Sequence, residues 1–340
     1  MKMLRPWMAV VITGLLVACG GGGGGGGGGD DAGGDDSPDV PVTPTTAPID
    51  PLSGVLTINP PLSVSWTVIN SIPVRTPDGT TAYAANLTVG MQTRRYVVIR
   101  PNPKPVSAPL LMILHPRDTT PELTANFTYV ADFVATQGIW AVMPEAVGGA
   151  WKGETLQGTD DMLFVGALLD ALIADGVDAD RITVAGYSSG GVMAQRLACE
   201  MADRIAAFGI VAAMMPFSQY LSCAPSQPRP KTYILGTDDP LVPYDGTAGL
   251  GSAASQMDYW SQQQGCSGVV SLPLPDIADD DTTVQRDEYT GCTNGRGLRL
   301  YTVQNGEHTW PGGDTDFTGR TSHDMSATGA IWSYARGFTR

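Results

Sequence analysis

The sequence predicts an α/β fold with a mainly parallel, doubly wound sheet flanked by helices. Seven short apolar segments rich in β-branched residues have the length of strands buried on both faces, and they lie at 95–100, 110–115, 139–143, 182–186, 208–212, 233–236 and 298–303. Helix-like segments, with apolar residues three to four positions apart, lie at 121–137, 160–174, 191–203, 252–264 and 326–337. Strands and helices that alternate in this way are typical of parallel sheets with crossover helices.

The first fifty residues differ in composition from the rest of the chain. Residues 1–19 have the features of an export signal, with a basic start and an apolar run too short to span a bilayer as a mature helix. Residues 20–50 are mostly Gly, Asp, Pro and Thr, which predicts a disordered tether. Residues 51–340 are long enough for a single α/β domain, in which we expect residues 51–93 to form strands that lead into the sheet.

The export signal ends in Leu16-Val17-Ala18-Cys19, which resembles the lipobox of bacterial lipoproteins. This resemblance implies that Cys19 is lipidated and anchors an exported chain at the cell envelope. The alternative is an ordinary small-residue cleavage site, after which the chain is secreted and Cys19 has no special role.

Charge and composition exclude several classes of partner. The formal net charge of −14 repels phosphate backbones and anionic lipids, so we expect no nucleic-acid partner and contact with a membrane only through Cys19. The sequence has no paired histidines at metal-ligand spacing, and the glycine run at 20–29 lacks the Lys-Ser/Thr ending of a phosphate-binding loop. We therefore expect no metal and no other cofactor, and no feature indicates a protein partner.

Beyond Cys19 the chain has an even number of cysteines, which in an exported protein favours disulfides over metal binding. They are Cys199, Cys223, Cys266 and Cys292. Four cysteines allow three pairings. We favour Cys199 with Cys223 and Cys266 with Cys292, because each of these pairs closes a short local loop.

The strand predicted at 182–186 is followed by the pattern Gly186-x-Ser188-x-Gly190 and then by a predicted helix. A serine in this position lies on a sharp strand-to-helix turn that exposes its hydroxyl above the sheet, as in the nucleophile turn of α/β-hydrolases. The glycines on either side leave room for the crowded backbone. Ser188 is therefore the predicted nucleophile, and the Ser189 N–H, at the start of the helix, is a predicted donor to an oxyanion.

A serine nucleophile requires a base, and the chain has three histidines. In α/β-hydrolases the order along the chain is Ser, acid, His, which excludes His115 as the base. His308 lies on a Gly-rich loop just after the strand predicted at 298–303, whereas His323 lies near a helix start and suits a capping or surface role. His308 is the preferred base, with His323 as the alternative.

The acid is expected after the strand at 233–236, in the loop that contains Asp238 and Asp239. Either aspartate suits the position. We prefer Asp239, because Pro240 constrains the turn immediately after it, and a turn-capping role accounts for Asp238. The carboxylate is expected to orient the imidazole and to stabilise the imidazolium as it forms.

The loop after the strand at 110–115 is expected to supply the second oxyanion donor. Proline has no N–H, so Pro116 cannot donate, and Arg117 is the better candidate. Aromatic residues near these loops are candidates to line a substrate pocket, although core packing explains each of them equally well. They are Tyr187, Trp151, Trp310 and Tyr244.

Three separated segments, VDADRITVAGYSSGGVMAQRLACE at 177–200, GTDDPLVPY at 236–244 and GEHTWPGG at 306–313, resemble the polyhydroxybutyrate depolymerase-like esterases. These enzymes are related to feruloyl and acetylxylan esterases, and the resemblance covers roughly residues 90–340. It implies an α/β-hydrolase with a Ser-His-Asp triad, and it places the family's cysteines near the nucleophile helix at Cys199 and Cys223. The chain departs from the family at Pro116, which replaces the glycine of a His-Gly pair.

The combined prediction is an exported serine carboxylic ester hydrolase that works through an acyl-enzyme. Hydroxyalkanoate oligomers or small esters are the leading substrates, and feruloyl or acetylxylan-type esters are the alternative. A hypothesis of another class is a surface-binding lipoprotein that keeps the fold but is catalytically silent. The complete triad argues against that hypothesis, while Pro116 in the oxyanion loop favours it.

Overall fold

The structure is a computed structural model that describes residues 62–153, 160–293, 296–314 and 319–340. All of these residues lie in one compact unit, residues 48–340. The predicted export signal with Cys19, the tether at 20–50 and residues 51–61 lie outside the described residues. No helix in the described part of the chain is both long and apolar enough to cross a membrane.

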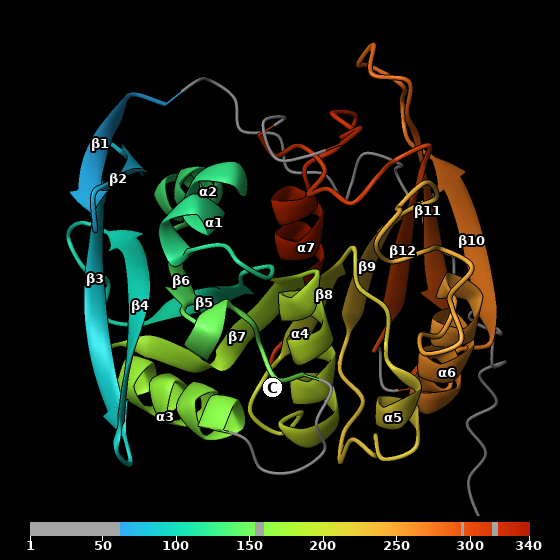
Figure 1. Ribbon diagram of the computed structural model, residues 1–340, viewed down its shortest axis with the longest axis horizontal. Helices are drawn as coiled ribbons and strands as arrows, with labels where there is room; N and C mark the ends of the chain where they lie inside the picture. The colour runs from blue at the N-terminus through green and yellow to red at the C-terminus, as the bar shows by residue number, and fades with distance from the viewer. Residues whose placement is uncertain (1–61, 154–159, 294–295, 315–318) are drawn as a thin grey trace, which may run out of the picture. The chain divides into compact units, whose positions relative to one another are not determined.

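A ten-stranded sheet runs through the unit in the order β10-β11-β12-β9-β8-β7-β5-β6-β4-β3 (Figure 1). The bounds of its strands are Thr80–Val89 (β3), Gln92–Pro101 (β4), Ala108–Leu114 (β5), Trp140–Pro144 (β6), Val177–Tyr187 (β7), Ala207–Val211 (β8), Lys231–Gly236 (β9), Gly268–Pro273 (β10), Thr283–Thr290 (β11) and Leu298–Gln304 (β12). The six strands from β6 to β12 across the middle pair in parallel, and two antiparallel strands close each edge. The predicted mainly parallel α/β sheet is therefore confirmed.

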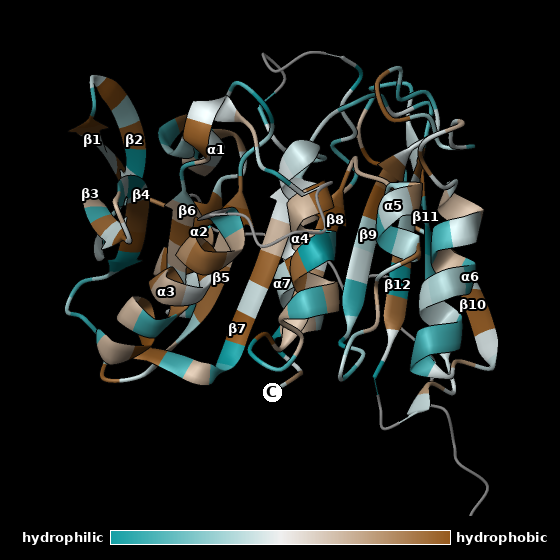
Figure 2. Ribbon diagram, turned by 60° about the horizontal axis from the view of Figure 1, so that its bottom comes forward, coloured by the Kyte–Doolittle hydropathy of each residue, from teal (hydrophilic) through white to brown (hydrophobic). Residues whose placement is uncertain are grey.

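Helices cover both faces of this sheet (Figure 1). Their bounds are Pro121–Phe127 (α1), Val130–Gln137 (α2), Asp160–Ala174 (α3), Ser189–Glu200 (α4), Phe217–Tyr220 (α5), Ala253–Gln264 (α6) and Ala327–Ala335 (α7). One apolar core joins the sheet to α3, α4 and α6, and a second core on the opposite face joins it to α1, α2 and α7. The central strands are buried on both faces, which explains their continuous apolar sequences, visible as brown segments on β7 and β8 in Figure 2.

The single helix predicted at 121–137 is wrong, because the chain forms two helices there. α1 ends at Phe127, and Tyr129 takes a left-handed conformation with φ of 50° before α2 begins. The Thr128 carbonyl accepts a hydrogen bond from the hydroxyl of Thr328, at 2.7 Å, which ties the break to the distant helix α7. Apolar periodicity continues across the break, so the pattern along the chain does not reveal it.

The strands expected to lead into the sheet divide between two sheets. β1 (Val64–Ile69) and β2 (Ile72–Pro77) form a separate antiparallel pair, and β3 joins the main sheet as its edge strand. On the opposite edge, β10 and β11 have no counterpart among the predicted strands. β10 is largely exposed although its sequence, GVVSLP, includes apolar residues, and β11 carries charged residues.

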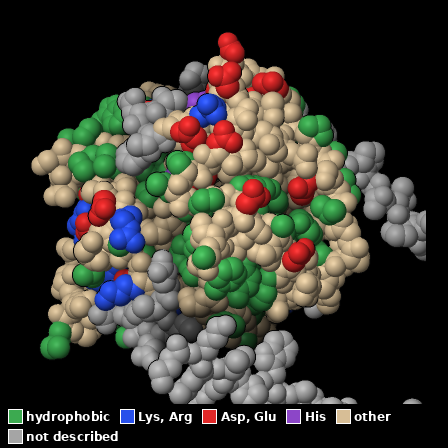
Figure 3. All heavy atoms as spheres, turned by 45° about the vertical axis from the view of Figure 1, so that its right-hand side comes forward, with side chains coloured by type: hydrophobic (Ala, Val, Ile, Leu, Met, Phe, Trp, Pro, Cys, Tyr) green, Lys and Arg blue, Asp and Glu red, His purple; other side chains and the backbone are tan. Residues whose placement is uncertain are grey.

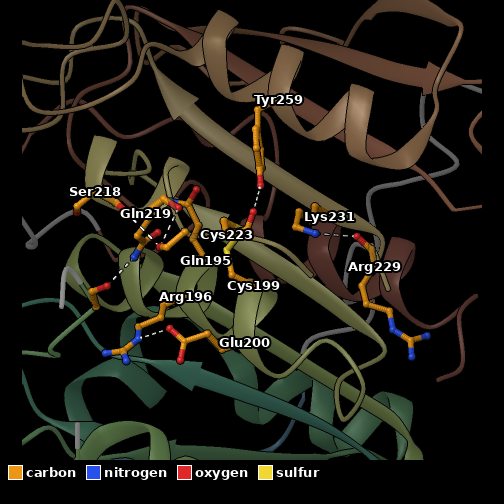
Figure 4. The surroundings of a disulfide bond; sticks show 12 residues. Gln195, Arg196, Cys199, Glu200, Ser218, Gln219, Cys223, Arg229, Lys231 and Tyr259 are labelled. Atoms are coloured by element: carbon orange, nitrogen blue, oxygen red, sulfur yellow. Dashed lines mark hydrogen bonds and ion pairs between the residues drawn. A yellow bond between two sulfur atoms is a disulfide. The ribbon is translucent and has the colours of Figure 1, made fainter. Parts of the chain in front are cut away.

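Two disulfides have the favoured pairing, Cys199 with Cys223 and Cys266 with Cys292. The first links the last turn of α4 to the segment after α5 (Figure 4). The Cys223 carbonyl also accepts a hydrogen bond from the hydroxyl of Tyr259 on α6, at 2.8 Å. The disulfide and this hydrogen bond thus connect α4 to α6, on the same face of the sheet, at the end of α4 that lies away from Ser188.

The surface view in Figure 3 shows Asp and Glu side chains distributed across one face, with hydrophobic side chains exposed among them. Exposed apolar side chains of the described residues include Phe217, Leu221 and Leu241, in the segments that follow β8 and β9.

Candidate active site

Ser188 occupies a strained turn between β7 and α4. Its backbone has φ of 54° and ψ of −120°, whereas α4 begins at the next residue. A non-glycine residue at positive φ is energetically costly, so surrounding contacts must hold it there. Such contacts include the Ser188 N–H, which donates to Val211 O on β8 at 3.0 Å, and the Ser188 carbonyl, which accepts from Val192 N in the first turn of α4.

Glycines allow the backbone to close around this turn. A Cβ on Gly186 would overlap the carbonyl oxygen of Gly190, and a Cβ on Gly190 would overlap the carbonyl oxygen of Leu114 at the end of β5. A Cβ on Gly191 would collide with the Ala213 side chain. The glycines of the motif are therefore required by close contacts, that of Gly186 with the start of α4 and that of Gly190 with the end of β5, and not only by the conformation of the turn.

Two adjacent parallel strands deliver the predicted acid and base. β9 pairs with β12 so that Gly236 lies opposite Val303, and beyond this pair Asp238 N donates to Gly306 O at 3.0 Å. Asp239 and His308 follow these contacts on their respective loops. The register of β9 and β12 thus brings together two residues that are 69 positions apart in the chain.

His308 Nδ1 lies 2.7 Å from Asp239 Oδ2, and both side chains are buried. The other oxygen of Asp239 accepts backbone N–H groups from Leu241 at 2.9 Å and Val242 at 2.8 Å, so the carboxylate is held at both ends. Because His308 Nδ1 is hydrogen-bonded to Asp239, Nε2 is the ring nitrogen that can exchange a proton with a hydroxyl.

Tyr187 supports the histidine from the turn itself. Its hydroxyl donates to the His308 carbonyl at 2.6 Å, and the two rings lie 5.3 Å apart between centroids. Burial and the nearby charge of Asp239 raise the pKa of Tyr187, so its hydroxyl keeps its proton and remains a donor. The residue beside Ser188 therefore positions the loop that carries His308.

The alternative base and acid lie elsewhere. His323 lies 3.4 Å from Asp280, and Asp238 pairs with Arg320 at 3.4 Å on the surface. Of the possible acid–histidine pairs considered from the sequence, the structure brings together Asp239 and His308.

Ser188 and His308 line the same cavity, which has a volume of about 500 Å³. Apolar side chains contribute much of its lining, and they are Val192, Met214, Leu241, Val242 and Leu250. Pro116, Arg117, Asp118 and Thr119 contribute a more polar part of the lining. A cavity of this size with both apolar and polar lining residues is typical of sites for small organic molecules.

Both predicted oxyanion residues, Ser189 and Arg117, line this cavity. Ser189 is the first residue of α4, where backbone N–H groups have no partner within the helix. In the loop after β5, Asp118 N donates to Gly149 O at 2.8 Å and Pro116 has no N–H. Arg117 is therefore the residue of this loop whose amide is best suited to face a substrate.

Of the four aromatic residues proposed for the pocket, Tyr187 alone is among the cavity-lining residues. Trp151 is buried and donates its indole N–H to His115 O at 3.0 Å, and Trp310 donates to Thr328 Oγ1 at 3.2 Å. The Tyr244 hydroxyl lies 2.9 Å from Thr302 Oγ1. These three side chains have partners in the core, as core packing implied, whereas the apolar lining comes from loop residues that belong to no motif.

We predict that Gly190→Ala destabilises the fold by about 3 kcal/mol or more, because a methyl group there overlaps the Leu114 backbone, which cannot move without shifting β5. Equilibrium unfolding in urea measures the difference. Gly249→Ala is the matched control, because a Cβ at Gly249 meets open space. Equal free energies of unfolding for the two variants would show that the turn is not constrained as described.

Comparisons with known proteins agree with this geometry. The family described as Phospholipase/Carboxylesterase matches residues 157–262, which include the nucleophile turn and the loop of Asp239. "Putative esterase NocK" of Nocardia uniformis subsp. tsuyamanensis is 28% identical over 301 residues, covering 80% of this chain and 84% of the relative. Feruloyl esterase B of Piromyces equi is 27% identical over 224 residues, covering 59% of this chain but only 40% of that protein.

Among solved structures, the acetyl xylan esterase from Aspergillus awamori superposes with a TM-score of 0.51 at 14% identity, covering 66% of this chain and 94% of the other. A thermostable esterase also gives a TM-score of 0.51 at 14% identity, covering 77% of this chain and 64% of the other. The structural comparisons establish the fold, and the sequence comparisons indicate the type of enzyme. The chain has the α/β-hydrolase fold and is a serine ester hydrolase.

Proposed function

We propose that this hydrolase cleaves carboxylic esters through an acyl-enzyme, with Ser188 as nucleophile, His308 as general base and Asp239 as the acid that orients it. The observation that carries the proposal is the 2.7 Å contact between His308 Nδ1 and Asp239, beside a cavity that both His308 and the strained Ser188 line. A carboxylate on Nδ1 keeps the proton on that nitrogen, so Nε2 is free to accept the proton of a serine hydroxyl.

In the first half of the reaction, Ser188 Oγ attacks the ester carbonyl carbon while His308 Nε2 takes its proton. The negative charge that develops on the carbonyl oxygen is stabilised by the N–H groups of Ser189 and Arg117. His308 then protonates the leaving oxygen, and the alcohol departs. In the second half, a water molecule gives a proton to His308 and attacks the acyl carbon. His308 then returns that proton to Ser188 Oγ as the bond to the acyl group breaks, which releases the acid and restores Ser188.

For the substrate, the relatives favour an ester with an aromatic acyl group, of the feruloyl type, and the cavity lining is compatible with it. One part of the cavity lining is apolar, with Met214, Leu241 and Leu250 among its residues. The relatives include feruloyl esterase B, as well as feruloyl esterase D of Neurospora crassa, which is 25% identical over 175 residues. Hydroxyalkanoate oligomers, which the sequence motifs favour, are the second candidate, because an apolar lining also suits short aliphatic acyl chains.

The proposed triad predicts distinct losses in matched pairs of variants. Asp239→Asn should lower kcat on p-nitrophenyl acetate on the order of 10⁴-fold, because it favours the wrong histidine tautomer, whereas Asp238→Asn should not. Similarly, His308→Ala should abolish turnover and His323→Ala should not.

Labelling with a fluorophosphonate provides an independent measurement of the nucleophile. The label should be lost in Ser188→Ala and kept in Ser261→Ala, which changes a serine on α6. Labelling or turnover that persists in Ser188→Ala would exclude the acyl-enzyme at this residue, whereas a wild-type chain that is neither labelled nor active would support the hypothesis of a silent binding protein.

A substrate panel separates the candidate acyl groups. We expect kcat/KM for methyl ferulate to exceed that for hydroxybutyrate oligomers, and Leu241→Ala to lower it about tenfold, because one apolar contact to the acyl group is lost. Leu241 is 69% exposed, so the change should leave folding intact. The p-nitrophenyl acetate reaction serves as the control, because an acetyl group is too small to require that contact. A preference for hydroxybutyrate oligomers would reverse the order of the two candidates.

We further propose that the chain is exported and held at the cell envelope by a lipid on Cys19. The leader sequence supports this, and the two disulfides are consistent with an oxidising compartment. Cells fed a clickable palmitate analogue should label the full chain, and Cys19→Ser should abolish the label and release the protein from the membrane fraction. A membrane-bound, unlabelled wild-type chain would contradict the lipid anchor.

A further inference from the structure

His115 is a fully buried histidine, outside the proposed triad, with both ring nitrogens engaged. Nδ1 lies 2.6 Å from the carbonyl oxygen of the next residue, Pro116, and Nε2 lies 2.9 Å from the backbone nitrogen of Ala146. A backbone N–H can only donate, so Nε2 is the unprotonated acceptor. A carbonyl can only accept, so Nδ1 carries the proton. The two partners therefore select one neutral tautomer of His115.

The surroundings of the ring support a neutral imidazole. Burial lowers the pKa of His115, opposed by its hydrogen bond to Pro116 O and by the charge of Glu145. Protonation of Nε2 would also place a second N–H against the Ala146 N–H. The ring therefore acts here as a fixed donor and acceptor and not as a group that takes up protons.

The contact to Pro116 determines the direction of a peptide at the cavity. The Pro116 carbonyl and the Arg117 N–H belong to one planar trans peptide, so they point in opposite directions. A donor that holds the carbonyl therefore also sets the direction of the Arg117 N–H. Pro116, Arg117 and Ser188 line the same cavity, and Arg117 carries the amide proposed above as an oxyanion donor.

Three hydrogen bonds attach the same loop to the segment after β6. Ala146 donates to the imidazole, Trp151 donates its indole N–H to His115 O at 3.0 Å, and Asp118 donates to Gly149 O at 2.8 Å. These contacts hold the ends of the loop, but the bond from Nδ1 is the one that acts on the Pro116–Arg117 peptide itself. This gives the imidazole a role distinct from general support of the loop.

We propose that His115 is a positioning residue for ester hydrolysis, whose Nδ1–H holds the Pro116 carbonyl so that the Arg117 N–H faces the developing oxyanion. This inference rests on the proposed function of Ser188. It also explains how a loop with proline in place of the usual glycine keeps a competent oxyanion donor, because the peptide after the proline is held by a side chain.

Two isosteric substitutions separate this role from a structural one. In His115→Asn the side-chain amide can keep a donor at the position of Nδ1, whereas in His115→Gln it can keep only an acceptor at the position of Nε2. We expect His115→Gln to lower kcat on p-nitrophenyl acetate about ten- to a hundredfold with KM unchanged, because the loss falls on the transition state. We expect His115→Asn to restore most of kcat.

Several outcomes would overturn the inference. It is wrong if His115→Gln keeps full kcat, or if the two variants lose kcat equally while their thermal unfolding midpoints remain near that of the wild type. Activity that survives in Ser188→Ala would instead overturn the proposed function, so the two failures are distinguishable.

Nitrogen-15 NMR of the wild-type protein tests the inference even if both variants fail to fold. The chain has three histidines, and samples of His308→Ala and His323→Ala assign the other two signals. The proposal requires a neutral His115 ring protonated on Nδ1. A ring protonated on Nε2, or on both nitrogens at neutral pH, would contradict it.

Discussion

The close approach of the backbone at the end of β7 is the constraint on which the site depends. Gly186 and Gly190 bring the turn against itself and against Leu114, so Ser188 is held at a positive φ that its own conformational preference opposes. The Ser188 carbonyl accepts a hydrogen bond from Val192 in the first turn of α4, and the Ser188 N–H donates to Val211 on β8. The cost of the strained conformation is thus offset by the packing of the central sheet.

Three neighbouring parts of the sheet then supply the remaining groups. β9 and β12 carry Asp239 and His308 on loops whose first residues are bonded to each other, and β5 ends at Leu114, just before His115 and the loop of Arg117. Parallel strands end at the same edge, so groups from distant parts of the chain meet there. Tyr187 links two of these parts, because it belongs to the turn and holds the His308 carbonyl.

Much of the fold and the polar part of the site could be predicted from the sequence. The parallel strands contain short apolar runs, because most of their residues are buried on both faces of the sheet. The serine motif was recognisable because Gly-x-Ser-x-Gly between a strand and a helix is typical of a sharp turn. β10, β11 and the break at Tyr129 were missed. The two strands are mostly exposed or charged, and the break depends on a contact between Thr128 and Thr328, 200 positions apart.

The sequence by itself determined the fold class, the strained serine and two candidates each for the acid and the base, because these depend on local periodicity and chain order. The sequence favoured Asp239 over Asp238 through the turn at Pro240, and only the strand register of the tertiary structure places the Asp239 carboxylate 2.7 Å from His308. The tertiary structure also gave Trp151, Trp310 and the partly buried Tyr244 partners away from the cavity, gave the cavity its apolar lining and assigned His115 two opposing partners. Each of these depends on residues that are adjacent in space and remote in sequence, which no pattern along the chain encodes.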